Sequence, residues 1–103
     1  MKRPLSMKEQ LDEAVKDGMT EDAFKAIRAE LGHAREKWGD AFDDKNTAND
    51  WIAYIVHYAG RAVTLPWNPV ACRAMLVKVA GLCVSAIIQI DINHGALPKR
   101  HYD

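Results

Sequence analysis

Residues 70–93 place the strongest constraint on the fold, because this segment is apolar on nearly every side when it is read as a helix. Its few polar side chains form a thin stripe of Lys78, Ser85 and Gln89, with Arg73 and Asp91 on another side. A helix of this kind has to be buried on most of its faces. The sequence predicts only three other helices to cover it. We therefore expect part of its surface to meet a second copy of the chain in a homodimer or a larger homo-oligomer.

Two helical patterns come first in the chain. Ser6 opens a capping-box pattern, and Gly18 is expected to end a short peripheral helix within residues 1–19. A second helix is expected to begin at Thr20 and to end at Gly39. Its apolar side consists of Phe24, Ile27, Leu31, Ala34 and Trp38. The second helix therefore belongs to the predicted core, whereas the first lies outside it.

The next two predicted helices carry capping signals at their starts. After an acidic loop over residues 40–46, Thr47 and Asp50 form a capping-box pattern. Asn68 is the expected N-cap of the last helix, and Pro69 is its expected first residue, where a missing backbone donor does no harm. Both helix starts are thus defined by local side chains.

These patterns together predict an all-α fold, in which a compact bundle of three to four helices packs or intertwines as a homodimer. No stretch of alternating residues predicts a strand. The 103 residues are expected to form one domain. Within it, residues 20–94 carry the core helices and residues 95–103 form a polar tail.

Charge and composition narrow the class of protein. Fourteen basic residues balance fourteen acidic ones, so no overall field favours binding to duplex nucleic acid or to an anionic membrane. The longest unbroken apolar run, residues 79–84, is shorter than the roughly 20 residues that span a bilayer. Cys72 and Cys83 lie too far apart on one helix to form a disulfide. We expect a soluble, cytoplasmic protein without a secretory signal.

The third predicted helix carries one line of side chains that is unusual for a solvated surface. At 100° per residue, this line of Asp50, Tyr54, His57 and Arg61 falls within about 60° of arc. The opposite side is an apolar arc expected to pack on the core, made of Trp51, Ile52, Ile55, Val56, Ala59, Ala62 and Val63. The polar line can bind an anion or stack on a ring, or it can form a solvated face or a hydrogen-bond network between helices.

Anion binding suits these residue types well. Arg61 can donate two parallel hydrogen bonds to a phosphate, and Lys78 places a cation within an otherwise apolar helix. Donors and ring faces come from His57, Tyr54 and Tyr58. The partner of Lys78 can be an internal aspartate or the phosphate of a ligand.

The three tryptophans differ in their expected roles. Trp38 and Trp51 lie on apolar helix sides and are expected in the core. Trp67 lies in the turn between Pro66 and Pro69, where its ring is the most available to stack on a base.

A magnesium site is a second chemical possibility, because Mg²⁺ takes oxygen ligands in octahedral geometry against phosphates. The candidate ligands are Asp43, Asp44 and Asp50. The same aspartates can instead cap a helix and form solvated turns. Neither cysteine lies near a predictable histidine, and no nucleophile motif is present, so nucleophilic catalysis is not expected.

The chain resembles a known family over roughly residues 36–91. The order of KWGD, acidic loop, capped helix, Pro turn and RAMLVKVAGLCVSAIIQID is similar to small phage-encoded members of the MazG-like, all-α nucleoside triphosphate pyrophosphohydrolases. The resemblance implies their helical fold and dimer. Family members carry an EExxE motif on one helix and an ExxD or ExxQ motif on the next. At these positions this chain has a lone Asp50, and then Met75 and Lys78.

A lysine where the family has a metal ligand predicts that fixed cations hold phosphates without Mg²⁺ and without hydrolysis. The leading hypothesis is therefore a phage-type protein that sequesters a nucleotide or another phosphorylated ligand and needs no cofactor. The expected contacts are Asp50, Tyr54, His57, Tyr58, Arg61, Trp67 and Lys78. One alternative is a Mg²⁺-dependent pyrophosphohydrolase, and another is an inhibitor or scaffold that binds a protein through the apolar last helix.

Overall fold

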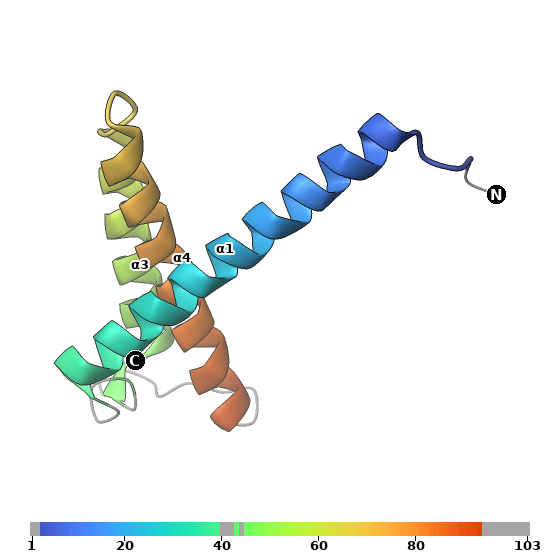
Figure 1. The fold of residues 1–103 in the computed structure, drawn as a ribbon. Helices are drawn as coiled ribbons and strands as arrows, with labels where there is room; N and C mark the ends of the chain where they lie inside the picture. The colour runs from blue at the N-terminus through green and yellow to red at the C-terminus, as the bar shows by residue number, and fades with distance from the viewer. Residues whose placement is uncertain (1–2, 40–42, 44, 94–103) are drawn as a thin grey trace.

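The computed structural model describes residues 3–39, 43 and 45–93 of the chain. Within these residues every regular element is a helix, which confirms the predicted all-α fold. The helices are α1 (Met7–Trp38), α3 (Ala48–Val63) and α4 (Pro69–Ile92). Figure 1 shows α3 and α4 side by side as an antiparallel hairpin, with α1 crossing the hairpin and its N-terminal half projecting away from it.

The first two predicted helices form a single continuous helix, so the expected break at Gly18 is wrong. Ser6 caps the start as predicted, because its hydroxyl accepts from the Glu9 N–H at 3.1 Å. Thr20 does not cap a new helix, since its hydroxyl donates to the Lys16 carbonyl one turn earlier at 2.9 Å. A glycine within a helix costs only about 1 kcal/mol relative to alanine, and the helix-forming residues on either side of Gly18 offset this cost. The helix ends at Gly39, whose φ is 74°.

The expected starts of the other two helices are confirmed. The Thr47 hydroxyl accepts from the Asp50 N–H at 3.2 Å, and the Asp50 carboxylate accepts from the Thr47 N–H at 2.8 Å. At the start of α4, the Asn68 side chain accepts from the Ala71 N–H at 3.1 Å, and Pro69 is the first residue of the helix. These caps fix where the chain enters each arm of the hairpin.

The hairpin carries the small core. The Trp51 side chain near the start of α3 is only 2% exposed, and Ala62 near the end of the same helix is also buried. The two arms meet where the Cys72 thiol lies 3.9 Å from the Ala62 carbonyl. Helix α1 contacts α4 but not α3. A Cβ built on Gly81 would lie 3.2 Å from Glu30 Cγ, so the missing side chain lets the two helices approach closely.

Much apolar surface stays uncovered, and this corrects the predicted apolar arc of α3. Ile52, Val56 and Val63 are exposed, although they were expected to pack on the core. The projecting half of α1 exposes large apolar side chains as well, namely Met7, Leu11, Val15 and Met19. A single chain therefore leaves large parts of all three helices open to contact.

Helix α4 is also long and apolar enough to cross a membrane, judged by its length and composition alone. Its most apolar stretch has a mean hydropathy of 1.9, and 11% of that stretch is buried inside the chain. The polar residues of α4 are spaced along one stripe, so they interrupt every long apolar run in the sequence. The mean hydropathy of the helix nevertheless stays high.

Two glycine substitutions test the continuity of α1. A Cβ at Gly18 meets no atom within 4 Å, so Gly18→Ala is expected to stabilise the fold by about 0.5–1 kcal/mol through helix propensity. Gly39→Ala is expected to destabilise it by about 1–3 kcal/mol, because φ at this position is 74°. Urea denaturation followed by far-UV circular dichroism measures both changes. A loss of stability in Gly18→Ala would mean that the helix ends there after all.

Candidate functional site

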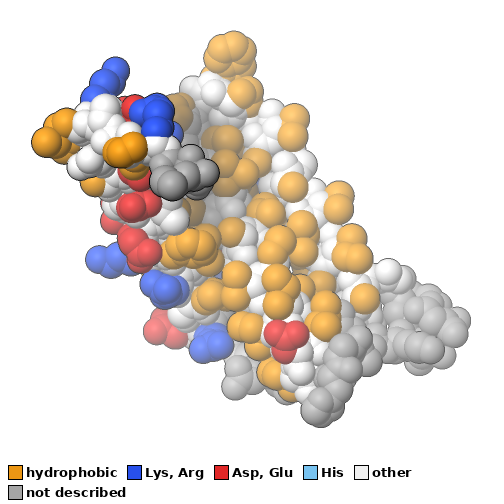
Figure 2. Space-filling model, turned by 90° about the vertical axis from the view of Figure 1, so that its right-hand side faces the viewer, with side chains coloured by type: hydrophobic (Ala, Val, Ile, Leu, Met, Phe, Trp, Pro, Cys, Tyr) orange, Lys and Arg blue, Asp and Glu red, His pale blue; other side chains and the backbone are white. Residues whose placement is uncertain are grey.

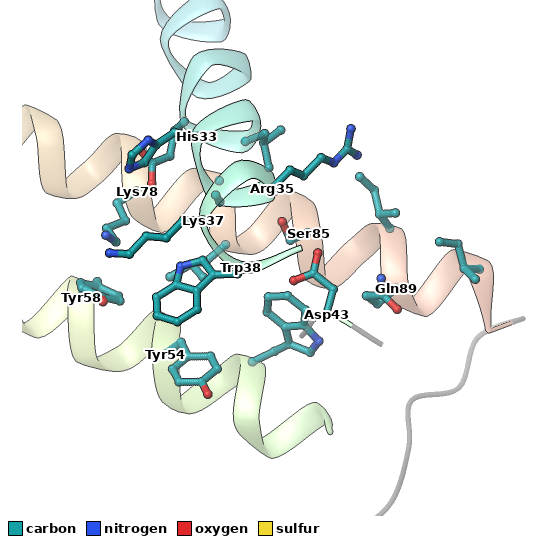
Figure 3. Close-up of a pocket in the computed structure, with 18 residues that line it drawn as sticks. His33, Arg35, Lys37, Trp38, Asp43, Tyr54, Tyr58, Lys78, Ser85 and Gln89 are labelled. Carbon is teal, nitrogen blue, oxygen red and sulfur yellow. The ribbon is translucent and has the colours of Figure 1, made fainter. Parts of the chain in front are cut away.

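A pocket of about 550 Å³ lies where α1 crosses the hairpin, and all three helices line it (Figure 3). Its walls combine aromatic rings with charged and polar side chains. Those labelled in the close-up are His33, Arg35, Lys37, Trp38, Asp43, Tyr54, Tyr58, Lys78, Ser85 and Gln89. This volume falls within the roughly 300–1,000 Å³ that small-molecule sites occupy in proteins.

The contribution of α3 is an aromatic face. Trp51, Tyr54 and Tyr58 all line the pocket, and their spacing of three and four residues places them on one side of a helix. Trp51 is fully buried, whereas the two tyrosines are half-buried. The Trp51 indole N–H has no hydrogen-bond partner among the described residues, and an unmet buried donor costs about 1–3 kcal/mol.

The contribution of α4 is the thin polar stripe of its sequence. Lys78, Ser85 and Gln89 recur at intervals of seven and four residues, so they face the pocket together. The Lys78 ammonium lies 4.8 Å from the centre of the Tyr58 ring, in a cation–π contact. Within the part of the chain that the structure describes, Lys78 makes no ion pair with a carboxylate. The internal aspartate considered as its partner is therefore not seen there.

The last two turns of α1 close the pocket. Lys37 and Lys78 both extend toward the end where Tyr58 lies, whereas Asp43 and Gln89 lie nearer the other end (Figure 3). The Lys37 ammonium also lies 5.0 Å from the centre of the neighbouring Trp38 ring. The two lysine amino groups thus lie at one end of the pocket, whereas Asp43 and Arg35 lie on the side nearer Ser85 (Figure 3).

The structure brings some of the predicted site residues together and leaves others outside. Tyr54, Tyr58, Lys78 and Asp43 line the pocket. Four others do not, and they are Asp50, His57, Arg61 and Trp67. The His57 ring packs edge-on against Tyr58 with 5.0 Å between ring centres, Arg61 is exposed, and Trp67 is 94% exposed in the turn before α4. The predicted polar line of α3 is therefore divided, because Tyr54 lines the pocket whereas His57 and Arg61 lie outside it.

The predicted magnesium ligands have different places in the structure. The Asp50 carboxylate is engaged as the cap of α3, Asp43 lines the pocket, and Asp44 lies outside the described residues. Among the residues with a described placement, no group of three or more His, Cys, Asp or Glu side chains could hold a metal ion.

The residues that sequence reasoning missed come chiefly from α1. Trp38 was expected in the core, but it is 55% exposed and lines the pocket. The other pocket residues of this helix include Glu30, His33, Arg35 and Lys37. Their only sequence signal was the density of charged and aromatic types just before Gly39. Which of them face a pocket depends on where α1 crosses the hairpin, and no local pattern encodes that crossing.

Comparison of the chain with protein-family models, with curated proteins and with solved structures gives no match. The arguments for function therefore come from the pocket and its residues.

Two tryptophan substitutions test how far the pocket wall supports the fold. Trp51→Ala is expected to destabilise the protein by about 3–5 kcal/mol, because it empties the one fully buried large side chain among the described residues. Trp67→Ala removes an equally large but exposed ring, so it should change the free energy of unfolding by less than about 0.5 kcal/mol. Urea titration with circular dichroism compares them, and equal effects would contradict the assignment of the core.

Proposed function

We propose that this pocket binds a nucleotide or another phosphorylated small molecule and holds it without hydrolysis. The proposal rests mainly on Lys78, a half-buried cation that faces the pocket. Its described contact is a tyrosine ring and not a carboxylate. A partly desolvated ammonium favours an anionic partner, since charge-assisted hydrogen bonds are about twice as strong as neutral ones.

The phosphate end of the ligand is assigned to the lysines. Lys37 joins Lys78 at the end of the pocket nearer Tyr58 (Figure 3), and the tyrosine hydroxyl can donate to a phosphate oxygen. The two lysines can supply the charge that Mg²⁺ supplies in many nucleotide sites, so this arrangement supports binding that is independent of metal.

The base end is assigned to the aromatic rings. Trp38 and Tyr54 both line the pocket, and stacking on such rings is worth about 1–3 kcal/mol per base. Asp43 and Gln89, at the other end from the lysines, can accept and donate hydrogen bonds at the edge of a base.

A matched pair of substitutions tests the role of the cation. Lys78→Gln is expected to weaken nucleotide binding by about 10- to 100-fold, because a charged hydrogen bond contributes about 1.5–3 kcal/mol. Arg61→Gln removes a charge from an exposed position outside the pocket and should leave the affinity within about twofold. Isothermal titration calorimetry against nucleoside mono-, di- and triphosphates, with EDTA and then with Mg²⁺, gives both affinities.

Chromatography of the recovered ligand separates binding from catalysis. Intact ligand after incubation with and without Mg²⁺ supports sequestration. Pyrophosphate released only with Mg²⁺ would overturn the non-hydrolytic proposal in favour of a pyrophosphohydrolase. Binding that is lost in Arg61→Gln and kept in Lys78→Gln would move the site out of the pocket, onto the exposed line of α3.

A further inference from the structure

The turn between α3 and α4 forms an apolar tip on the hairpin, which comprises residues 62–72. This segment contains no charged side chain. Val63, Trp67 and Val70 are its most exposed large side chains, with exposed fractions of 77%, 94% and 81%. Figure 1 shows the apolar tip well beyond the place where α1 crosses the hairpin, so no described helix covers it. Because water is an unfavourable environment for such side chains, the tip is suited to contact with an apolar phase.

Two arginines stand at the base of the apolar tip, one on each helix. Arg61 and Arg73 directly flank it in the sequence, and both are exposed. They lie at the same level of the hairpin, because their neighbours Ala62 and Cys72 are in contact, with the Cys72 thiol 3.9 Å from the Ala62 carbonyl. Neither guanidinium forms an ion pair with a described residue. The base of the tip thus offers two cations to anionic groups around it.

The hairpin around the tip is cationic as well. Residues 51–90 contain Arg61, Arg73 and Lys78 but no aspartate or glutamate. All fourteen acidic residues of the chain lie before or after this segment, so the overall balance of charge conceals a local excess of positive charge. Figure 2 shows the same division, since the hairpin is mostly hydrophobic in that view and most of the charged side chains lie on α1. The hairpin is therefore attracted to an anionic surface through its own charges.

We propose that the apolar tip inserts into the headgroup region of an anionic lipid membrane. In this arrangement the Trp67 ring lies at the boundary between headgroups and acyl chains, where tryptophan is enriched in membrane proteins. Arg61 and Arg73 contact lipid phosphates on either side of the tip. The exposed side chains of the tip lie outside the pocket, so this inference does not rest on the proposed ligand.

The dimensions of the apolar tip fit this depth. Arg73 is four residues beyond Pro69, the first residue of α4, and four residues extend about 6 Å along a helix axis. Interfacial segments bury their apolar side chains about 5–10 Å into the boundary between headgroups and acyl chains. With the two guanidinium groups level with the lipid phosphates, the turn that carries Trp67 therefore reaches this boundary.

A matched pair of valine substitutions tests the insertion. Val70→Glu places a carboxylate among lipid headgroups and acyl chains, so it is expected to weaken binding to vesicles of phosphatidylcholine and phosphatidylglycerol by about tenfold or more. Val15→Glu adds the same charge on the projecting half of α1, where Val15 is 61% exposed, and should leave the affinity within about twofold. Flotation of the whole chain with the vesicles measures both affinities, and circular dichroism checks that the helical content is kept.

Two results of the flotation experiment would overturn the proposal. One is wild-type protein that does not bind the anionic vesicles at low ionic strength, which would leave the apolar tip to a protein partner. The other is an equal effect of Val70→Glu and Val15→Glu, which would mean that the tip is not the part of the chain that meets the lipid.

Neutral substitutions test the two arginines. Arg61→Gln and Arg73→Gln are each expected to weaken binding to the anionic vesicles about fivefold, which is the contribution of one basic residue near such a surface. Neither should change the binding to vesicles of phosphatidylcholine alone. Sodium chloride should weaken the binding of the wild-type protein, since salt screens exposed charges. Binding that responds neither to salt nor to these substitutions would overturn the role of the arginines.

Fluorescence quenching locates the Trp67 ring. Lipids brominated on their acyl chains are expected to quench part of the emission of the wild-type protein, and Trp67→Phe should abolish this quenching because the other two tryptophans line the pocket. Quenching that persists in Trp67→Phe would overturn the assigned depth. Protein that alkaline carbonate cannot extract from the vesicles would overturn the interfacial arrangement too, because it would place α4 across the bilayer.

Discussion

The close approach of α1 to α4 at Glu30 and Gly81 helps to position the pocket. The backbone of α1 comes close to α4 and not to α3, so this crossing sets where the last turns of α1 stand over the hairpin. With no side chain at position 81, Glu30 Cγ comes to 3.2 Å from where a Cβ would be. An alanine at position 81 would require the Glu30 side chain to shift by a few tenths of an ångström. Because Glu30 and Gly81 both line the pocket, such a shift would alter its wall.

Local signals in the sequence predicted much of this fold. The capping residues Thr47, Asp50 and Asn68 marked helix starts that the structure confirms, since a cap depends on neighbours three residues away. The polar stripe of α4 was visible too, and it lines the pocket. The expected helix end at Gly18 was wrong, because a glycine ends a helix only where the chain also turns. The share of α1 in the pocket could not be predicted, since it follows from packing between residues about fifty positions apart.

The same long-range packing explains why the apolar side of α3 was misjudged. Its spacing showed which residues of α3 are apolar, but not which of them are buried. Trp51 and Ala62 are buried within the chain, whereas Ile52 and Val56 are exposed. An amphipathic pattern shows which side of a helix is apolar, and one chain on its own covers only part of that side. The hairpin thus has one side with the pocket and another side with exposed apolar residues.

The projecting half of α1 has a consequence for motion. A helix of 32 residues is about 48 Å long, and from Met7 to Asp22 nearly all of its side chains are exposed. Tertiary packing supports helices far more than propensity does, so this half can unwind turn by turn while the pocket wall beyond Ile27 stays in place. The amide hydrogens of α1 are therefore expected to exchange quickly near its start and slowly near its end.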